Sequence, residues 1–421
     1  MAKKNMIIAQ SGGPSSAINA SICGAISRAI AADEIGHVFG AVNGMQGLLD
    51  RKIICIDEQM IKTEDFDMLI HTPAQALGSS RYKIPQGPDG DAVFEQILEI
   101  LREYNIGYFF YNGGNDSMDT VNRVANFLKE KNIDDIVAVG IPKTIDNDLM
   151  FTDHTPGFGS AARYVATSIA ELELDSGVYP NPGVTIVEIM GRNAGWLTAA
   201  SVLAKDSGST APDLIYLPEV AFSKDKFIEQ LGAKLEEKKH VLVAVSEGIR
   251  DKDGVYLADT GAAVDMFGHK TLGGVATELE KLIKEKLPID KLKIRPVQFS
   301  TLQRAGAHLA SDTDLKESFQ CGFRAVEAGI AGKTAIMITI NRTSDEPYLV
   351  KYDEAPLNNI ANAEKEVPAE WITEDGAGVT QDMVTYLRPL VSGEASEKFV
   401  AGLPQFFRFD WTKIINPADY K

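Results

Sequence analysis

The chain has 421 residues, of which 44% are hydrophobic and 24% are charged, so its length and composition predict a globular protein of two or three domains. The formal net charge of −17 argues against a surface that binds nucleic acid or anionic lipid, and a phosphate ligand would therefore need a confined pocket. The three cysteines, Cys23, Cys55 and Cys321, lie far apart, which indicates neither a disulfide framework nor a zinc site. Since no apolar stretch suits a signal peptide or a membrane span, we expect a cytoplasmic protein without a membrane partner.

Strands and helices alternate along most of the chain. We expect strands at 6–9, 37–42, 107–111, 136–141, 184–189, 214–217, 241–245 and 335–340. We expect helices at 17–32, 91–104, 117–130, 160–174, 194–205, 224–238 and 315–328. Strand–helix–strand units form parallel sheets with right-handed crossovers, so the pattern predicts an α/β protein with mainly parallel sheets. A boundary near residue 150 would separate a first sheet from a second. Beyond Arg342 the pattern loosens into a C-terminal tail.

The segment that follows the strand at 136–141 concentrates polar chemistry. Lys143, Thr144, Asp146 and Asp148 lie within six residues, directly after an apolar run. In open α/β sheets, catalytic and binding groups gather just beyond the carboxyl ends of the strands, so we interpret this segment as an active-site loop. The alternative is a solvated turn in which the aspartates cap a helix.

Two glycine-rich turns follow other strands of the first sheet. Gly12-Gly13 comes after the first strand, and Gly113-Gly114 comes after the strand at 107–111. Glycines allow the backbone to approach a ligand, and the N–H groups at the start of the next helix favour an anion. Either turn alone could be only a tight strand-to-helix connection. Two such turns beside a loop of carboxylates favour phosphate chemistry.

Arginines also stand near glycines and strand ends. Arg81 follows Leu77-Gly78-Ser79-Ser80, Arg192 follows Met190-Gly191, and Arg295 and Arg304 flank another apolar run. An isolated arginine is usually a surface residue, yet this placement suits a sugar phosphate.

The order of these motifs resembles the phosphofructokinase family, and most closely its pyrophosphate-dependent branch. The resemblance runs from about residue 7 to 345 and includes Pro142-Lys143-Thr144-Ile145-Asp146-Asn147-Asp148, Glu247-Gly248 and Gln303-Arg304. It implies two three-layer α/β/α domains: a donor-binding domain at 1–150, joined by part of 305–345, and a sugar-phosphate-binding domain at 151–304. The extension at 346–421 keeps an unknown role.

The resemblance also implies residue roles. Asp146 would be the general base that takes the C1 hydroxyl proton of fructose 6-phosphate, helped by Lys143, Thr144 and Asp148. The implied donor-binding residues are Gly12, Gly13, Arg81, Gly114, Asn115, Asp116 and Ser117. The implied substrate-binding residues are Thr144, Asp146, Met190, Gly191, Arg192, Glu247, Arg295 and Arg304. The family uses Mg²⁺, which Asn115 and Asp116 would hold, and its members form homodimers or homotetramers.

Two positions favour pyrophosphate as the donor. Asp116 stands where ATP-dependent members have a glycine that leaves room for the nucleotide, and Lys143 stands where they tend to have glycine. We therefore expect a reversible transfer of phosphate from pyrophosphate to fructose 6-phosphate, in glycolysis or gluconeogenesis. Three departures keep alternatives open. Asn115 replaces a common aspartate, which leaves Asp116 or Asp146 as metal ligand, while Thr301 and Gly183 leave room for sedoheptulose 7-phosphate. An ATP-dependent 6-phosphofructokinase and a non-catalytic paralogue are the remaining alternatives.

Overall fold

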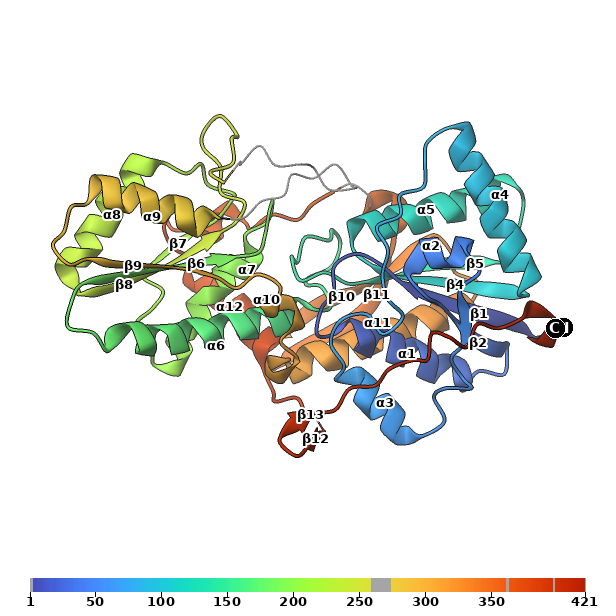
Figure 1. Cartoon of the computed structure of the whole chain (residues 1–421). Helices are drawn as coiled ribbons and strands as arrows, with labels where there is room; N and C mark the ends of the chain where they lie inside the picture. Colours follow the sequence, from blue (N-terminus) through green and yellow to red (C-terminus); the bar gives the residue numbers. More distant parts are fainter. Residues whose placement is uncertain (1–2, 259–273, 361–362, 397, 421) are drawn as a thin grey trace.

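Figure 1 shows two α/β bodies side by side, each built around its own sheet. The structure is a computed structural model and describes residues 3–258, 274–360, 363–396 and 398–420. The predicted α/β fold with mainly parallel sheets is confirmed, and the predicted strands each form part of one of the two sheets.

The first sheet has seven strands in the order β11-β10-β5-β4-β1-β2-β3. Their bounds are β1 (Lys4–Gln10), β2 (Ile35–Ala41), β3 (Ile53–Cys55), β4 (Ile106–Gly113), β5 (Val137–Pro142), β10 (Ile336–Asp345) and β11 (Tyr348–Pro356). All neighbouring strands are parallel except the two edge pairs, β2 with β3 and β10 with β11. The edge strand β11 therefore comes from the segment expected to be a C-terminal extension.

Helices cover both faces of this sheet, which explains why its central strands are apolar throughout. In β1, Ile7 and Ala9 belong to one core and Met6 and Ile8 to the other, because successive side chains point to opposite faces. On one face lie α2 (Gly44–Leu49), α4 (Pro88–Glu103) and α5 (Asn115–Glu130), and on the other lie α1 (Ile18–Ile30), α3 (Thr63–Ile70) and α11 (Asp312–Ile330).

The second sheet is fully parallel, with the order β7-β8-β6-β9. Its strands are β6 (Gly183–Ile189), β7 (Leu214–Tyr216), β8 (His240–Ser246) and β9 (Lys293–Gln298). One face packs against α8 (Lys224–Glu237) and α9 (Val275–Lys286). The other packs against α6 (Phe158–Gly177), α7 (Trp196–Ala199) and α12 (Gln381–Leu387), and the short α10 (Leu302–Ala305) follows β9.

The helix predicted at 194–205 is present, but it begins at Trp196 and changes its winding along its length. Only Trp196–Ala199 is α-helical, and Ala200–Ser207 continues as a 3₁₀-helix. Ser201 and Ser207 donate hydrogen bonds to the carbonyl oxygens three residues earlier, at 2.6 and 2.7 Å. Such serine bonds compete with the α-helical pattern and accompany a tighter winding.

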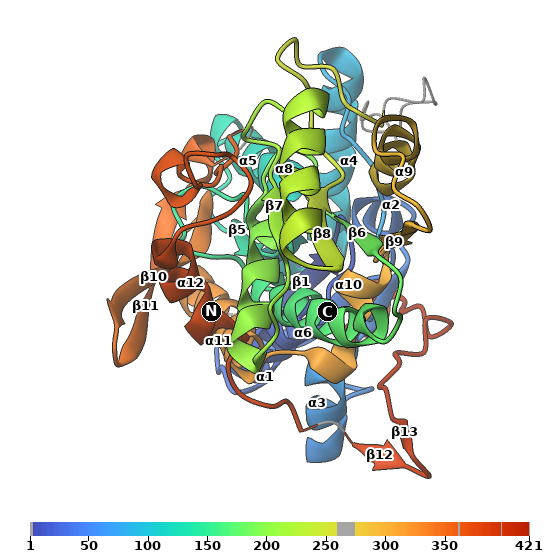
Figure 2. The ribbon, with the colours of Figure 1, turned by 90° about the vertical axis from the view of Figure 1, so that its left-hand side faces the viewer.

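The last part of the chain returns to the first body after α12. Beyond the hairpin of β12 (Phe399–Val400) and β13 (Leu403–Pro404), residues 405–420 run along β3 and the segment after α3, and we call them the C-terminal strap. Phe407 N–H donates to Thr72 Oγ1, Trp411 Nε1 donates to the Ala76 carbonyl, and Ile415 N–H donates to the Ile53 carbonyl, each at 2.9 Å. Figure 2 shows the hairpin projecting below α3.

The structure bears on two expectations from composition. The three cysteines are free and buried. Within the described ranges, every helix is too short or too polar to cross a membrane.

Candidate active site

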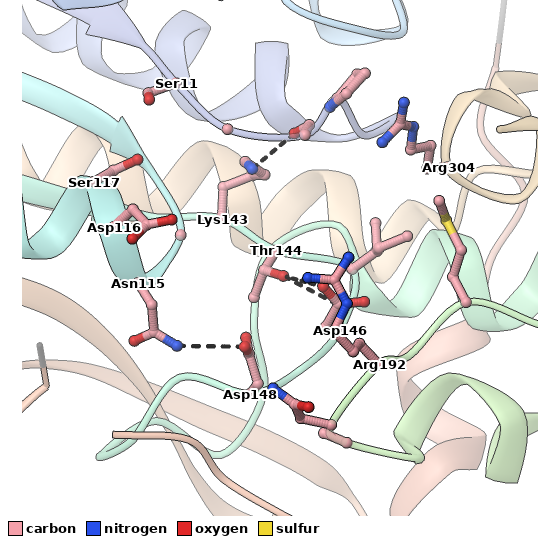
Figure 3. Close-up of a pocket in the computed structure, with 18 of the residues that line it drawn as sticks. Ser11, Asn115, Asp116, Ser117, Lys143, Thr144, Asp146, Asp148, Arg192 and Arg304 are labelled. Carbon is pink, nitrogen blue, oxygen red and sulfur yellow. Dashed lines mark hydrogen bonds between the residues drawn. The ribbon is translucent and has the colours of Figure 1, made fainter. Parts of the chain in front are cut away.

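A cavity of about 540 Å³ lies where the two bodies meet, at the carboxyl ends of β1, β4 and β5. Figure 3 shows Asn115, Asp116 and Ser117 on one side of the view and Arg304 on the other, with side chains of the loop after β5 between them. Of the predicted residues, Gly12, Gly13, Arg81, Gly114, Asn115, Asp116, Ser117, Lys143, Thr144, Asp146, Asp148, Met190, Arg192, Glu247 and Arg304 line this cavity. Sequence motifs separated by nearly 300 residues are thereby brought to one place.

Two predicted residues are not in the lining. Gly191 lies between two lining residues, and its φ of +132° with a carbonyl 2.5 Å from where a Cβ would be explains why glycine stands there. Arg295 lies outside the cavity, where its guanidinium pairs with Asp175 at the end of α6. Its predicted phosphate-binding role stays a prediction.

The first glycine turn is held from two sides. Gly12 has a φ of +79°, and its carbonyl accepts hydrogen bonds from Gln75 Nε2 and Ser79 Oγ, both at 2.9 Å. The Lys143 ammonium donates to the Gly13 carbonyl at 2.7 Å, and a Cβ on Gly12 would lie 3.2 Å from that nitrogen. We call residues 143–153, which the sequence predicts to be catalytic, the catalytic loop. Its lysine is thus inserted beneath the glycine turn.

The second glycine turn opens α5, a helix of 16 residues whose N-cap is Gly114. The first N–H groups of a helix have no partner within it and carry a partial positive charge, which suits an anion. Lys143, Arg81 and this helix start therefore concentrate positive charge on one side of the cavity, inside a protein of strongly negative net charge.

The catalytic loop holds its carboxyl groups in a buried setting. Thr144 Oγ1 donates to Asp146 Oδ2 at 3.4 Å and accepts from the Asp146 N–H at 3.1 Å. Burial raises the pKa of Asp146 against the lowering effect of Lys143, and burial together with the Asp146 charge raises the pKa of Asp148 to about 7. Burial lowers the pKa of Lys143 to about 8, although both aspartates oppose this change. Side chains with pKa values shifted in this way are common at catalytic sites.

One corner of the cavity suits a divalent cation. Asn115 Nδ2 donates to Asp148 Oδ2 at 3.3 Å, while Asn115 Oδ1 and Asp148 Oδ1 are buried without a hydrogen-bond partner among the described residues. Amide and carboxylate oxygens are ligands that Mg²⁺ accepts. Asp116, the other predicted ligand, is exposed at the rim. The structure therefore places Asp148, which the sequence analysis did not consider as a metal ligand, beside Asn115.

The opposite wall comes from the second body. Met190 N–H donates to Gln303 Oε1 at 3.1 Å, which fixes the loop after β6 against α10. Arg192 Nε and Arg304 Nε are buried and lack a hydrogen-bond partner in the described part of the chain. Burial and the nearby Asp146 charge raise the pKa of Glu247 to about 7. This wall offers guanidinium groups, which suit a phosphate, and a carboxyl group, which suits hydroxyls.

Sequence reasoning missed several lining residues. They are Ser11, Pro14, Tyr82, Thr120, Ile145, Asn193, Ala194 and Glu364. Most adjoin a predicted residue, so adjacency to a motif could have found them. Glu364 had no such signal, because it belongs to an irregular segment of the expected extension.

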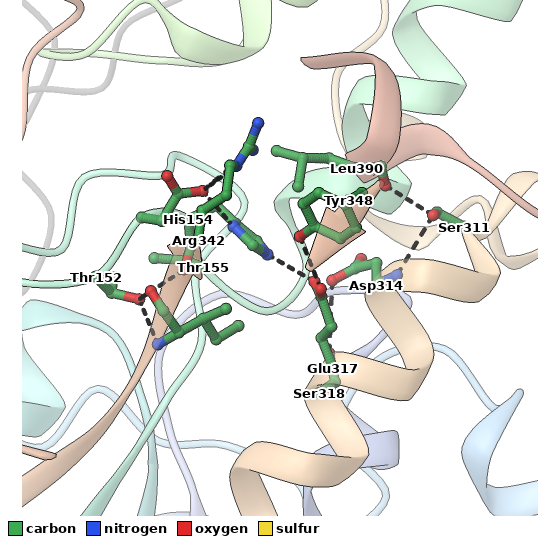
Figure 4. A network of polar contacts seen from close by, with 12 residues as sticks. Thr152, His154, Thr155, Ser311, Asp314, Glu317, Ser318, Arg342, Tyr348 and Leu390 are labelled. Atoms are coloured by element: carbon green, nitrogen blue, oxygen red, sulfur yellow. Dashed lines mark hydrogen bonds and ion pairs between the residues drawn. The ribbon is translucent and has the colours of Figure 1, made fainter. Parts of the chain in front are cut away.

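A buried polar network supports the far end of the catalytic loop (Figure 4). His154 Nε2 lies 2.6 Å from Glu317 Oε2, and His154 Nδ1 lies 2.8 Å from Asp153 Oδ1. Tyr348 Oη donates to Glu317 Oε1 at 2.7 Å, and Arg342 pairs with Asp153. The loop that begins under the glycine turn therefore ends on α11 and on the β10–β11 edge.

These features define a two-body α/β cleft equipped for transfer between a phosphate-bearing donor and a polar acceptor, where positioning and charge neutralisation do most of the work. The family model described as phosphofructokinase matches residues 5–328, and the chain belongs to the phosphofructokinase family.

The relatives point in the same direction. The chain is 41% identical over 408 residues to pyrophosphate–fructose 6-phosphate 1-phosphotransferase of Halomonas elongata, and 42% identical over 409 residues to the protein of that name from Methylococcus capsulatus, with 96% of each chain covered. Its fold matches the crystal structure of the pyrophosphate-dependent phosphofructokinase from Nitrosospira multiformis with a TM-score of 0.86, 36% identity and 96% of both chains covered.

Proposed function

We propose that the protein transfers a phosphoryl group reversibly from pyrophosphate to the C1 hydroxyl of fructose 6-phosphate, which gives fructose 1,6-bisphosphate and phosphate. The observation that carries this proposal is the buried Lys143 ammonium at 2.7 Å from the Gly13 carbonyl, on the loop that also holds Asp146. A compact donor with high charge suits a lysine in that position. Asp116 at the rim would repel the α-phosphate of a nucleotide.

The reaction follows from the arrangement of the loop. Asp146 accepts the C1 hydroxyl proton as that oxygen bonds to the nearer phosphorus of pyrophosphate, and the bond from this phosphorus to the bridging oxygen breaks, so that orthophosphate leaves. The raised pKa of Asp146 brings it closer to the working pH of a general base, and Thr144 fixes its orientation. Arg81, Lys143 and the start of α5 neutralise the donor, while Arg192 and Arg304 hold the sugar phosphate. Asn115 and Asp148 would hold Mg²⁺, which would supply further positive charge for the phosphoryl oxygens.

The two bodies divide these tasks. We assign donor binding to residues 1–150 with part of 305–345, and sugar-phosphate binding to residues 151–304. The donor-side turns come from β1 and β4 of the first sheet, and the Met190–Arg192 loop follows β6 of the second. We also propose a cytoplasmic setting, since both substrates are small charged metabolites.

A homodimer or homotetramer is part of the proposal. Leu174 and Val178, near the end of α6, are 74% and 70% exposed, and they lie beside the Asp175–Arg295 pair. Apolar side chains of this size suit contact with a second copy of the chain. Light scattering after size-exclusion chromatography tests the state, and a monomeric wild-type protein would refute it.

The experiment that tests the function is an initial-rate assay of the purified protein with Mg²⁺. Pyrophosphate and ATP are compared as donors to fructose 6-phosphate, with sedoheptulose 7-phosphate as a second acceptor. Activity with pyrophosphate and fructose 6-phosphate is expected. Activity with ATP alone would refute the donor assignment, and activity with sedoheptulose 7-phosphate alone would refute the acceptor. Chelation of Mg²⁺ should abolish turnover, and its return should restore turnover.

A further inference from the structure

The pair Glu364-Lys365 reaches the active site from the segment that connects β11 to α12. Residues 363–368 around this pair form neither helix nor strand, and Lys365 lies more than 200 residues after the catalytic loop that it contacts. Glu364 lines the cavity and accepts a hydrogen bond from Asn193 Nδ2 at 3.0 Å. Lys365 turns the other way, toward the back of the catalytic loop.

Lys365 is bonded to the loop through both its main chain and its side chain. Its N–H donates to the Asp148 carbonyl at 2.8 Å. Its ammonium donates to the carbonyls of Asp153 at 2.7 Å and Thr152 at 3.1 Å, and to Asn147 Oδ1 at 3.4 Å. These acceptors are spread from residue 147 to 153, so Lys365 forms hydrogen bonds along the whole second half of the loop.

Lys365 is itself anchored in the second body. Its carbonyl accepts a hydrogen bond from Trp196 Nε1 at 2.8 Å, and its ammonium lies 5.1 Å from the centre of the Trp196 ring, within the range of a cation–π contact. The position of the ammonium is therefore set by a residue that the catalytic loop does not supply.

The loop needs such support because its backbone is unusual. Asn147 and Phe151 have φ values of +57° and +63°, a left-handed conformation that is strained for a bulky residue such as phenylalanine. Surrounding contacts must stabilise it. Tyr386 of α12 gives a second contact, since its hydroxyl donates to the Asp153 carbonyl at 2.7 Å and accepts from Asn147 Nδ2 at 2.8 Å.

We infer that Lys365 is a positioning residue for phosphoryl transfer: by binding the carbonyls of residues 152 and 153 and the Asn147 amide, it keeps Asp146 and Asp148 facing the cavity. Glu364 acts beside it, because it accepts a hydrogen bond from Asn193 and so holds the loop after β6 next to the same segment. This inference rests on the proposed function for its catalytic consequence, whereas the loop's order can be measured without any turnover.

The test compares Lys365→Met, which keeps the length of the side chain and removes the charge, with Lys365→Ala. Lys351→Met is the matched control, because Lys351 is an exposed lysine on β11 that pairs with the nearby Asp353, away from the catalytic loop. Steady-state kinetics and hydrogen–deuterium exchange of the amides in residues 146–153 are measured on each variant, after circular dichroism has established that it is folded.

We expect Lys365→Met to lower kcat about 100-fold, since a displacement of about 1 Å has an effect of this size, while KM for pyrophosphate changes by less than about threefold. Exchange of the loop amides should rise relative to Lys351→Met. Propylammonium, which matches the missing part of the side chain, should restore part of the kcat of Lys365→Ala and none of that of Lys365→Met.

Unchanged kcat and unchanged loop exchange in folded Lys365→Met would overturn the inference. Loss of activity with unchanged loop exchange and no rescue by propylammonium would also overturn it, since the lysine would then act in another way. If Lys365→Met does not fold, the inference is decided by Lys365→Ala instead: it stands if propylammonium restores part of kcat and the loop amides exchange faster than in Lys351→Met, and it falls if neither is observed. A wild-type protein that is inactive with pyrophosphate refutes the proposed function, and the exchange measurement still decides the role of Lys365.

Discussion

The ion pair of His154 and Glu317 behind the catalytic loop allows a quantitative test of the structure. Both side chains are buried, and their nearest atoms are 2.6 Å apart. Although burial alone lowers the pKa of His154, the carboxylates of Glu317 and Asp153 raise it from 6.5 to about 9. His154→Gln replaces the imidazolium with a neutral side chain that can still donate a hydrogen bond to Glu317.

The size of the effect follows from the pKa change. A difference of about 2.5 pKa units corresponds to about 3 kcal/mol of unfolding free energy, because each unit is worth about 1.4 kcal/mol. A group whose pKa is raised on folding stabilises the protein fully below its unfolded pKa. That contribution is lost as the pH rises through the folded pKa. The His154 contribution should therefore be complete at pH 6 and mostly absent at pH 10.

Urea unfolding of the wild type and of His154→Gln at pH 6, 7.5, 9 and 10, followed by circular dichroism, measures this dependence. The difference in unfolding free energy should shrink from about 3 kcal/mol toward zero over this range. His308→Gln is the control, since His308 is exposed and should give a small difference at every pH. A difference for His154→Gln that stays constant from pH 6 to pH 10 would refute the assignment of a charged His154 in the folded protein.

Three further predictions concern the reaction itself. Asp146→Asn should lower kcat by about 10²–10⁴-fold with little change in the melting temperature, and a loss below about tenfold in steady-state assays would exclude Asp146 as the base. Asp116→Gly should raise kcat/KM for ATP and lower it for pyrophosphate in parallel donor assays, whereas an unchanged ratio would contradict the donor argument. Trp411→Ala should raise KM for pyrophosphate more than KM for fructose 6-phosphate, because the Trp411 ring lies 3.2 Å from where a Gly78 Cβ would be, and Gly78 stands three residues before Arg81 in the same loop. Equal changes in both KM values would show that the strap does not act through the donor loop.

The sequence was most informative where structure is locally determined. The glycine turn at Gly12-Gly13 and the loop at Lys143–Asp148 could be predicted because each follows an apolar strand, and the carboxyl ends of parallel strands meet at one edge. The shared cavity follows from this rule together with the order of the sheet. The helix predicted at 194–205 is present, but its change from α-helical to 3₁₀ winding could not be predicted, because apolar periodicity does not separate the two. The 3₁₀ winding accompanies serine hydroxyl bonds here.

Other features depend on contacts that no local pattern records. Glu364 and Lys365 lie in an irregular segment, so nothing in their neighbours indicated the cavity. Arg295 was expected at a strand end, but it is the third residue of β9, and its side chain pairs with Asp175 instead of reaching the carboxyl edge. Asp148 could not be predicted as a partner of Asn115, because the contact depends on the distance between the start of α5 and the loop after β5.

The hydrogen bond between Lys365 and Asn147 has a consequence for folding during synthesis on the ribosome. The two residues are 218 positions apart, so at about 5–20 residues per second the lysine is synthesised about 10–40 seconds after the loop that it holds. For most of that interval, β10 and β11 have not been synthesised either, and the loop that carries Asp146 lacks its contacts with Lys365. If Lys365 positions the loop as inferred, a nascent chain that already carries every motif of the family would gain full activity only after Lys365 has been synthesised and has bound the loop.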